Sequence, residues 1–281
     1  MQVLRTIDSM RAWSADARLT AAGIGFVPTM GALHAGHVSL MRIAREHAER
    51  LVVSIFVNPL QFGPQEDFER YPRDFEHDAA ICRNTGVDAL FCPSAEEIYR
   101  SDQSIFVEES SLSQGLCGAF RPGHFRGVLT VVAKLLNIVR PDIAVFGQKD
   151  AQQARMIEKL VCDLNFGLRI VVAPTLREPD GLAMSSRNVY LTPDERRRAS
   201  SLSQGLHAAL ALVSAGERRA DVLKAAVRAV IDTAGSDQVE YVEIVAWDDL
   251  RPVEKIDRKC LAAVAVRFGR TRLIDNVVLA P

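Results

Sequence analysis

The 281-residue sequence predicts an α/β fold, and three observations lead to this prediction. Apolar runs of strand length recur through the first two thirds of the chain, at residues 25–27, 51–57, 89–92, 143–146 and 168–172. The runs are continuous rather than alternating, which is typical of strands covered on both faces. Helical patterns separate them, as at residues 38–50 and 128–139. We therefore expect a doubly wound, mostly parallel sheet of Rossmann-like type, with ligand loops at the carboxyl ends of its strands.

The pattern changes after about residue 187, which indicates a second, smaller domain. Thr192 can cap a helix there, and Pro193 fits the first helical position. A further helix at residues 221–233 precedes three strand-like runs, at 239–245, 261–268 and 273–279. We expect a domain over residues 1–176 and an α+β domain over residues 177–281.

Net charge and composition limit the classes of partner that this protein is expected to have. The formal net charge of −1 provides no long-range attraction for nucleic acid or for an anionic membrane. No apolar stretch approaches the ~20 residues of a membrane helix, and residues 1–17 lack the apolar block of a secretory signal. We expect a cytoplasmic protein with small-molecule substrates and no nucleic-acid or membrane partner. The five cysteines are scattered and odd in number, so buried, reduced thiols are the expectation, with no role assigned to Cys117.

Two histidines, His34 and His37, follow the first strand-like run. At this spacing they share a face on a helix, and Gly31 and Gly36 allow a tight turn with close approach of backbone to a ligand. The N-terminus of a helix favours phosphate, and imidazoles there can donate hydrogen bonds to developing charge. Ordinary structural histidines and a zinc pair are the alternatives, although a third ligand at helical spacing is missing from the sequence nearby.

A hydroxyl-rich run, Met184-Ser185-Ser186-Arg187, begins the second domain. Hydroxyls and a guanidinium are good phosphate partners, although a plain turn between domains has the same composition. Lys149 follows the strand at residues 143–146, so its ammonium belongs at the carboxyl edge of the sheet. Together these groups suggest an enzyme that activates a carboxylate by adenylation.

The two motifs resemble the two signatures of the class I nucleotidyltransferase superfamily. Five longer segments are similar to the pantothenate synthetase family, in order and over nearly the whole chain: 56–63, 71–73, 121–128, 146–153 and 177–188. Gln148 and Ala151 depart from the family's usual residues, an acidic one and a larger one, which concerns local packing rather than the reaction. Another nucleotidyltransferase and a catalytically silent nucleotide-binding regulator remain the rival interpretations.

The resemblance implies a reaction and a set of residues. ATP and pantoate give pantoyl adenylate and pyrophosphate, and β-alanine then gives pantothenate, a coenzyme A precursor, and AMP. It implies ATP as substrate, Mg²⁺ and a homodimer. It implies that His34, His37 and Lys149 are catalytic, that Gln61 and Gln153 bind pantoate, and that Gln61 also faces β-alanine.

The remaining assignments follow from the same resemblance or are weaker. The residues implied in ATP binding are Met30, Gly31, Ala32, Leu33, His34, Ala35, Gly36, His37, Gly147, Gln148, Lys149, Asp150, Leu176, Met184, Ser185, Ser186 and Arg187. Asp78 is a weak candidate for a metal ligand, with a solvated helix charge as the alternative. Asn58 is a candidate for contact with the ribose or the reacting carboxylate. The glycine-rich segment 115–127 is expected to form a mobile wall or lid, and His124 receives no role.

Overall fold

The computed structural model describes residues 1–20, 23–64 and 66–281, and these form two compact units. Unit 1 comprises residues 1–109, 121–147 and 153–174, and unit 2 comprises residues 110–120, 148–152 and 175–281. The domains expected from the sequence were contiguous and met at residues 176 and 177. The units differ from that expectation because two short segments from within residues 1–176, at 110–120 and 148–152, pack within unit 2.

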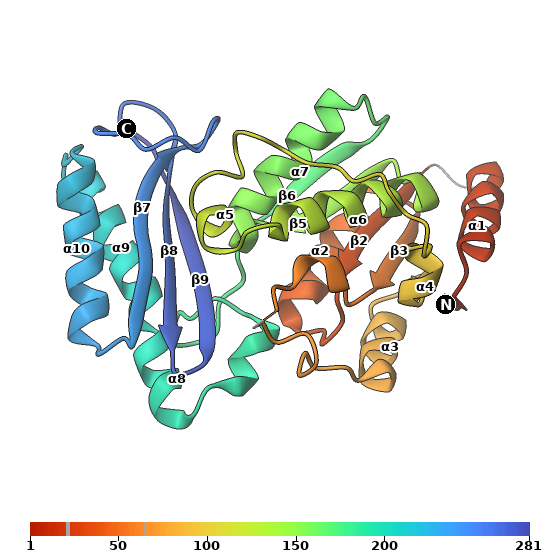
Figure 1. The fold of residues 1–281 in the computed structure, drawn as a ribbon, viewed down its shortest axis with the longest axis horizontal. Helices are drawn as coiled ribbons and strands as arrows, with labels where there is room; N and C mark the ends of the chain where they lie inside the picture. Colours follow the sequence, from red (N-terminus) through yellow and green to blue (C-terminus); the bar gives the residue numbers. More distant parts are fainter. Residues whose placement is uncertain (21–22, 65) are drawn as a thin grey trace. The chain divides into compact units, whose positions relative to one another are not determined.

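Unit 1 is built on a six-stranded sheet (Figure 1). In chain order its strands are β1 (Gln2–Leu4), β2 (Ile24–Thr29), β3 (Arg50–Ile55), β4 (Ala89–Phe91), β5 (Ile143–Gly147) and β6 (Arg169–Ala173). They lie in the order β1-β4-β3-β2-β5-β6, and each neighbouring pair is parallel. The prediction of a doubly wound, mostly parallel sheet is confirmed.

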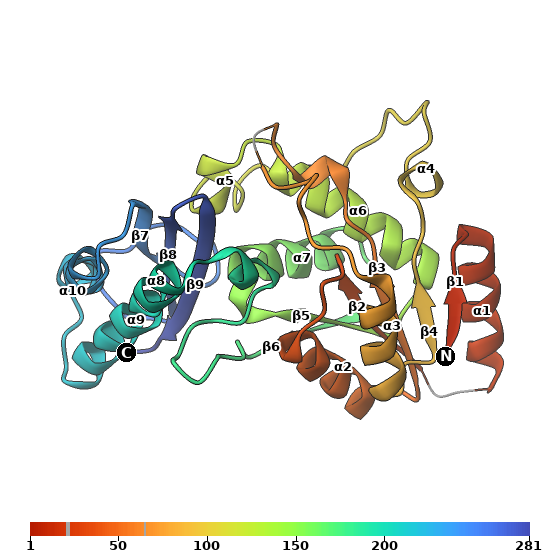
Figure 2. The ribbon, with the colours of Figure 1, turned by 90° about the horizontal axis from the view of Figure 1, so that it is seen from below.

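Helices cover both faces of this sheet (Figure 2). On one face, α2 (Ala35–His47) and α3 (Phe75–Asn84) share an apolar cluster with β2, β3 and β5. On the other face, α1 (Ile7–Thr20) and α6 (His124–Val139) contact β2 and one another, with α7 (Ala151–Asp163) beside α6. The short helices η1 (Pro59–Gln61) and α4 (Ala95–Ile98) follow β3 and β4. The helix stripes in the sequence thus supply the crossovers of a parallel sheet.

The strand order reverses at β2, which fixes where a ligand is expected. The chain builds outward from β2 to β3 and β4, then continues on the other side of β2 with β5 and β6. The ladder pairs Gly25 with Ile143, so the carboxyl ends of β2 and β5 open at one edge of the sheet. In open α/β sheets, ligands bind at such a switch point.

Unit 2 holds an antiparallel sheet of three strands, β7 (Gln238–Ala246), β8 (Cys260–Phe268) and β9 (Thr271–Leu279), in that order. The helices α9 (Ser201–Ser214) and α10 (Ala220–Thr233) pack on one face and close an apolar core with it (Figure 1). Before them, α8 (Pro193–Ala199) is capped by Thr192, whose hydroxyl accepts a bond from the Glu195 N–H in a capping box. Unit 2 also contains η2 (Gln148–Asp150), α5 (Cys117–Phe120) and η3 (Ser186–Tyr190). Over the described ranges, every helix is too short or too polar to cross a membrane.

Candidate active site

The loop that leaves β2 is held by buried side chains. The Thr29 hydroxyl accepts the Gly31 N–H at 3.1 Å, and the Asp78 carboxylate accepts the N–H groups of Ala32 and Leu33 at 2.9 and 2.7 Å. Gly31 has a φ of +83°, and an added Cβ would lie 2.9 Å from an Asp78 oxygen. A glycine is therefore required where the loop turns toward α2.

Asp78, a candidate metal ligand in the sequence, instead binds backbone N–H groups of the loop after β2. Its side chain is 1% exposed, and each of its two oxygens accepts a backbone N–H. Burial raises the pKa of its carboxyl, while the two N–H bonds act in the opposite direction. The carboxylate positions the loop, and both of its oxygens are already engaged in doing so.

His34 and His37 lie together, as their spacing predicted, but His34 caps α2 instead of belonging to it. The His34 Nδ1 atom accepts the Gly36 N–H at 3.1 Å, and the His37 Nδ1 atom accepts the His34 N–H at 3.3 Å. The ring centroids are 4.2 Å apart. Because Nδ1 is an acceptor in both rings, a neutral ring carries its proton on Nε2. The two imidazoles therefore form a reciprocal cap at the first turn of α2, where backbone N–H groups and the helix dipole favour an anion.

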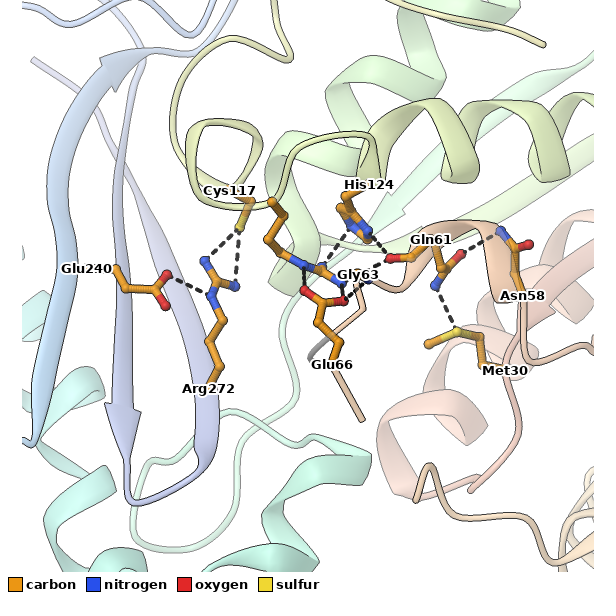
Figure 3. A network of polar contacts seen from close by, with 10 residues as sticks. Met30, Asn58, Gln61, Gly63, Glu66, Cys117, His124, Glu240 and Arg272 are labelled. Carbon is orange, nitrogen blue, oxygen red and sulfur yellow. Dashed lines mark hydrogen bonds and ion pairs between the residues drawn. The ribbon is translucent and has the colours of Figure 1, made fainter. Parts of the chain in front are cut away.

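Gln61 lies in a network of amides after β3 (Figure 3). Its side-chain N–H donates to the Met30 sulfur at 2.8 Å, and its side-chain oxygen accepts from Asn58 at 3.1 Å. Asn58 is 1% exposed, and its oxygen accepts from the Tyr99 hydroxyl at 2.7 Å. Asn58 is therefore engaged within unit 1 and orients Gln61, a role that differs from the expected contact with ribose or carboxylate.

A charged cluster holds the backbone of Gln61 from the other side (Figure 3). Glu66 makes a two-pronged ion pair with Arg121, with both N–O distances 2.6 Å. The Gln61 carbonyl accepts from Arg121 at 3.2 Å and from His124 Nδ1 at 2.8 Å. Burial alone would raise the pKa of Glu66, but the Arg121 guanidinium overcomes this and lowers that pKa to about 2. Since Nδ1 donates, His124 Nε2 accepts from Arg121 at 2.9 Å, which makes the ring a neutral link in the cluster.

In unit 2, the turn that carries Lys149 is held by its backbone. The Asn276 amide on β9 donates to the carbonyls of Gln148 and Lys149 at 3.0 and 2.9 Å. The Gln148 side chain returns a bond to the Asn276 oxygen at 3.4 Å. Gln148, one of the two departures from the family's usual residues, thus takes part in local packing.

The hydroxyl-rich run follows a narrow hairpin in unit 2. Met184 N–H donates to the Leu176 carbonyl at 3.0 Å, which joins two residues expected at the nucleotide. Ser185 then caps η3, because its hydroxyl accepts the Arg187 N–H at 3.3 Å. Residues 184–187 are all half-buried, and Leu176 is 40% exposed. Gly147 ends β5 and Gln153 lies half-buried in the first turn of α7, both within unit 1.

The expected lid contains a segment with fixed contacts in unit 2. The Gln152 amide, 5% exposed, accepts the Cys117 N–H at 2.9 Å and donates to the carbonyls of Leu112 and Gly115 at 2.8 Å. The Cys117 sulfur lies 3.2 Å from the Tyr241 hydroxyl. It also lies 3.6 Å from two nitrogens of Arg272 (Figure 3). Burial, followed by the neighbouring thiol, raises the pKa of Tyr241 well above its ordinary value. Within unit 2, Leu112, Gly115 and Cys117 are thus tied to Gln152, and Cys117 also to the antiparallel sheet.

The positioning groups Glu66, Arg121, Asn276 and Gln152 were not predicted from the sequence. Each contacts backbone or side-chain atoms of residues that are distant along the chain, so the spacing of residues in the sequence does not reveal these contacts. The run Arg121-Pro122-Gly123-His124 was noted only as part of a resemblance. Polar side chains inside otherwise apolar elements, such as Asn276 in β9, are the one local signal that points to them.

A doubly wound parallel sheet with polar loops at its switch point defines the class, an α/β protein of the nucleotide-binding kind. The family model for pantoate–β-alanine ligase matches residues 2–278. The pantothenate synthetase of Thermotoga neapolitana is 54% identical over 279 residues, which is 99% of this chain and 100% of that protein. The chain belongs to the pantoate–β-alanine ligase family.

Solved structures agree with this assignment. The pantothenate synthetase of Thermus thermophilus has a TM-score of 0.94 at 42% identity, with 100% of both chains covered. The pantoate–β-alanine ligase of Francisella tularensis, solved with a β,γ ATP ligand and β-alanine, has a TM-score of 0.81 at 33% identity and covers 99% of this chain and 97% of its own. Sequence and fold therefore both place the chain among the pantoate–β-alanine ligases.

Proposed function

We propose that this chain makes pantothenate through a pantoyl adenylate. A pantoate carboxylate oxygen attacks the α-phosphorus of ATP, a new P–O bond forms and pyrophosphate leaves. The β-alanine amine then attacks the activated carbonyl, loses a proton and displaces AMP. The observation that carries this proposal is the position of the paired-imidazole loop, which leaves β2 at the switch point of the sheet.

The first step brings a carboxylate to a polyanion, so positive charge and donors must offset the repulsion. We assign the phosphate oxygens to the Nε2–H groups of His34 and His37, next to the N–H groups of the first turn of α2. Lys149, Ser185, Ser186 and Arg187 add an ammonium, two hydroxyls and a guanidinium. Residues 30–37, residues 147–150, Leu176 and Met184 are assigned to the rest of the nucleotide.

Pantoate offers hydroxyls and a carboxylate, which neutral amides can orient without added charge. We assign Gln61 and Gln153 to pantoate, and Gln61 to β-alanine as well. The support for Gln61 is its fixed orientation, since Asn58 and Met30 hold its side chain and Arg121 and His124 hold its carbonyl. Such preorganisation is what positioning of two reactants requires.

Mg²⁺ is proposed to bind together with ATP. The ion keeps several waters and commonly binds substrate phosphates with few protein carboxylates. Among the residues that the structure describes, there is no group of three or more His, Cys, Asp or Glu side chains that could hold a metal ion. Both oxygens of Asp78 accept backbone N–H groups. When bound, the ion neutralises phosphate charge. We also propose a cytoplasmic location and a homodimer, on the resemblance to the family.

The test is a pair of assays on purified protein. Pantoate-dependent exchange of pyrophosphate into ATP reports the first step, and AMP formation that requires ATP, pantoate and β-alanine together reports both. His37→Ala should lower the exchange rate by ~10²–10³ with unchanged circular dichroism, because one preorganised donor to developing charge is lost. Exchange at the wild-type rate in His37→Ala would remove His37 from the mechanism. Exchange with CTP or an amino acid in place of ATP or pantoate would favour another nucleotidyltransferase.

A further inference from the structure

Two adjacent residues of β9, Asp275 and Asn276, are polar and buried within an otherwise mostly apolar strand. Their exposed fractions are 1% and 4%. Successive side chains of a strand point to opposite faces, and the neighbours Leu273 and Val277 belong to the apolar core with α9 and α10. Asp275 therefore points to the helix-covered face, and Asn276 points to the other.

Asn276 holds the turn that carries Lys149. Its amide donates to the carbonyls of Gln148 and Lys149 at 3.0 and 2.9 Å, so both amide hydrogens are used on this one turn. The turn η2 also packs against β9. The backbone from which the Lys149 side chain leaves is thus fixed by a single buried amide.

Asp275 holds the hairpin that leads to Ser185 and Arg187. It makes a two-pronged ion pair with Arg177, at 2.6 and 3.0 Å, and its side chain is 0% exposed. Arg177 also donates to the Gly181 carbonyl at 3.0 Å, at the tip of the hairpin. Residue 184 closes the same hairpin through its bond to Leu176, and η3, which follows, packs against β9.

We propose that Asp275 and Asn276 are positioning residues for adenylation. Asn276 positions the Lys149 ammonium, and Asp275 positions the hydroxyl-rich run at residues 184–187. This inference rests on the proposed function of those groups. Buried polar and charged groups cost desolvation free energy, and an apolar pair at residues 275 and 276 would avoid that cost. Their presence is explained if the strand must hold two loops to within a fraction of an ångström of their working positions.

The experiment measures pantoate-dependent ATP–pyrophosphate exchange in single and double variants. Asn276→Ala should lower kcat by ~10–100-fold, because the Lys149 turn is released while the ammonium itself remains. In a Lys149→Ala background the same change should cost less than ~2-fold, since the group it positions is already gone. Asp275→Asn should instead raise the KM for ATP by ~10-fold, and it should lose this effect in an Arg187→Ala background.

Val227→Ala in the core of α10 is the matched control for stability. It lowers Tm without touching either loop, so its exchange rate below Tm should equal that of the wild type. Asn276→Ser keeps one donor and should recover part of the lost rate, and it replaces Asn276→Ala if the latter does not fold. If Asn276→Ala lowers the rate by the same factor with and without Lys149, the amide acts on general structure and the inference is wrong. If Lys149→Ala has wild-type exchange, the assignment of Lys149 fails instead.

Discussion

Replacement of Glu66 by glutamine should lower the free energy of unfolding and should also loosen the contact of Arg121 with the Gln61 carbonyl. The change keeps the shape of the side chain and removes its charge, so the Arg121 guanidinium loses its partner. A pKa near 2, against an ordinary 4.5, means that the fold favours the ionised carboxylate by roughly 3 kcal/mol. The Glu66 side chain is 27% exposed, and solvent screening reduces the expected loss to about 2 kcal/mol.

This contribution has a defined pH dependence. Because the folded-state pKa is lowered, the stabilisation is complete above about pH 4.5 and is lost as the pH falls from there toward 2. Urea unfolding of the wild type and of Glu66→Gln should therefore differ by about 2 kcal/mol at pH 7, and the difference should shrink steadily as the pH falls below 4. The KM for pantoate should rise several-fold at pH 7, since the Gln61 carbonyl loses well-placed donors.

Glu69→Gln is the matched control, because Glu69 is an exposed carboxylate three residues along the same loop. It should leave the free energy of unfolding within about 0.5 kcal/mol of the wild type. The reasoning is refuted if Glu66→Gln and Glu69→Gln have the same stability at pH 7. It is also refuted if the deficit of Glu66→Gln is unchanged between pH 7 and pH 3.

Three further outcomes follow from the site and its supports. Gly31→Ala, at a φ of +83° and with its Cβ 2.9 Å from Asp78, should destabilise the protein by ~1–3 kcal/mol and lower exchange activity, as urea unfolding and the exchange assay will measure. Asp78→Asn should lower thermal stability, because the NH2 group that replaces one carboxylate oxygen cannot accept the backbone N–H bonded there. The Mg²⁺ concentration for half-maximal exchange should stay at the wild-type value, and a large increase would restore Asp78 as a metal ligand. Thr192→Ala should cost ~1 kcal/mol through loss of the α8 cap without changing kcat, and Thr192→Ser should recover most of that loss.

Most of the fold could be predicted because its signals are local. The strands β2 to β6 are continuous apolar runs, and β7 to β9 lie within about two residues of their predicted bounds. The strand β1 was not predicted, because it has only three residues, two of them exposed, and is defined by its pairing with β4. The sequence predicted one helix after Thr192 and before the helix at residues 221–233, whereas the structure has two there, α8 and α9, which meet at Ser200.

The candidate site was predictable where a motif carries its own chemistry. The spacing of His34 and His37 indicated a shared face, and their rings do lie together. Their exact relation, a helix cap that uses Nδ1 of both rings, depends on backbone geometry that spacing does not contain. Asp78 illustrates the limit, since a carboxylate in a helix has the same sequence signal whether it faces solvent, a metal or backbone N–H groups such as that of Leu33, 45 residues away.

The path of the chain between the two units limits how this protein can be divided. It passes from one unit to the other five times, at residues 109/110, 120/121, 147/148, 152/153 and 174/175. A fragment that begins at residue 175 would lack Cys117, which contacts Tyr241 and Arg272, and the turn at residues 148 and 149 that Asn276 holds. A cut at any single point therefore cannot yield a carboxyl-terminal fragment that holds all of unit 2 and nothing of unit 1.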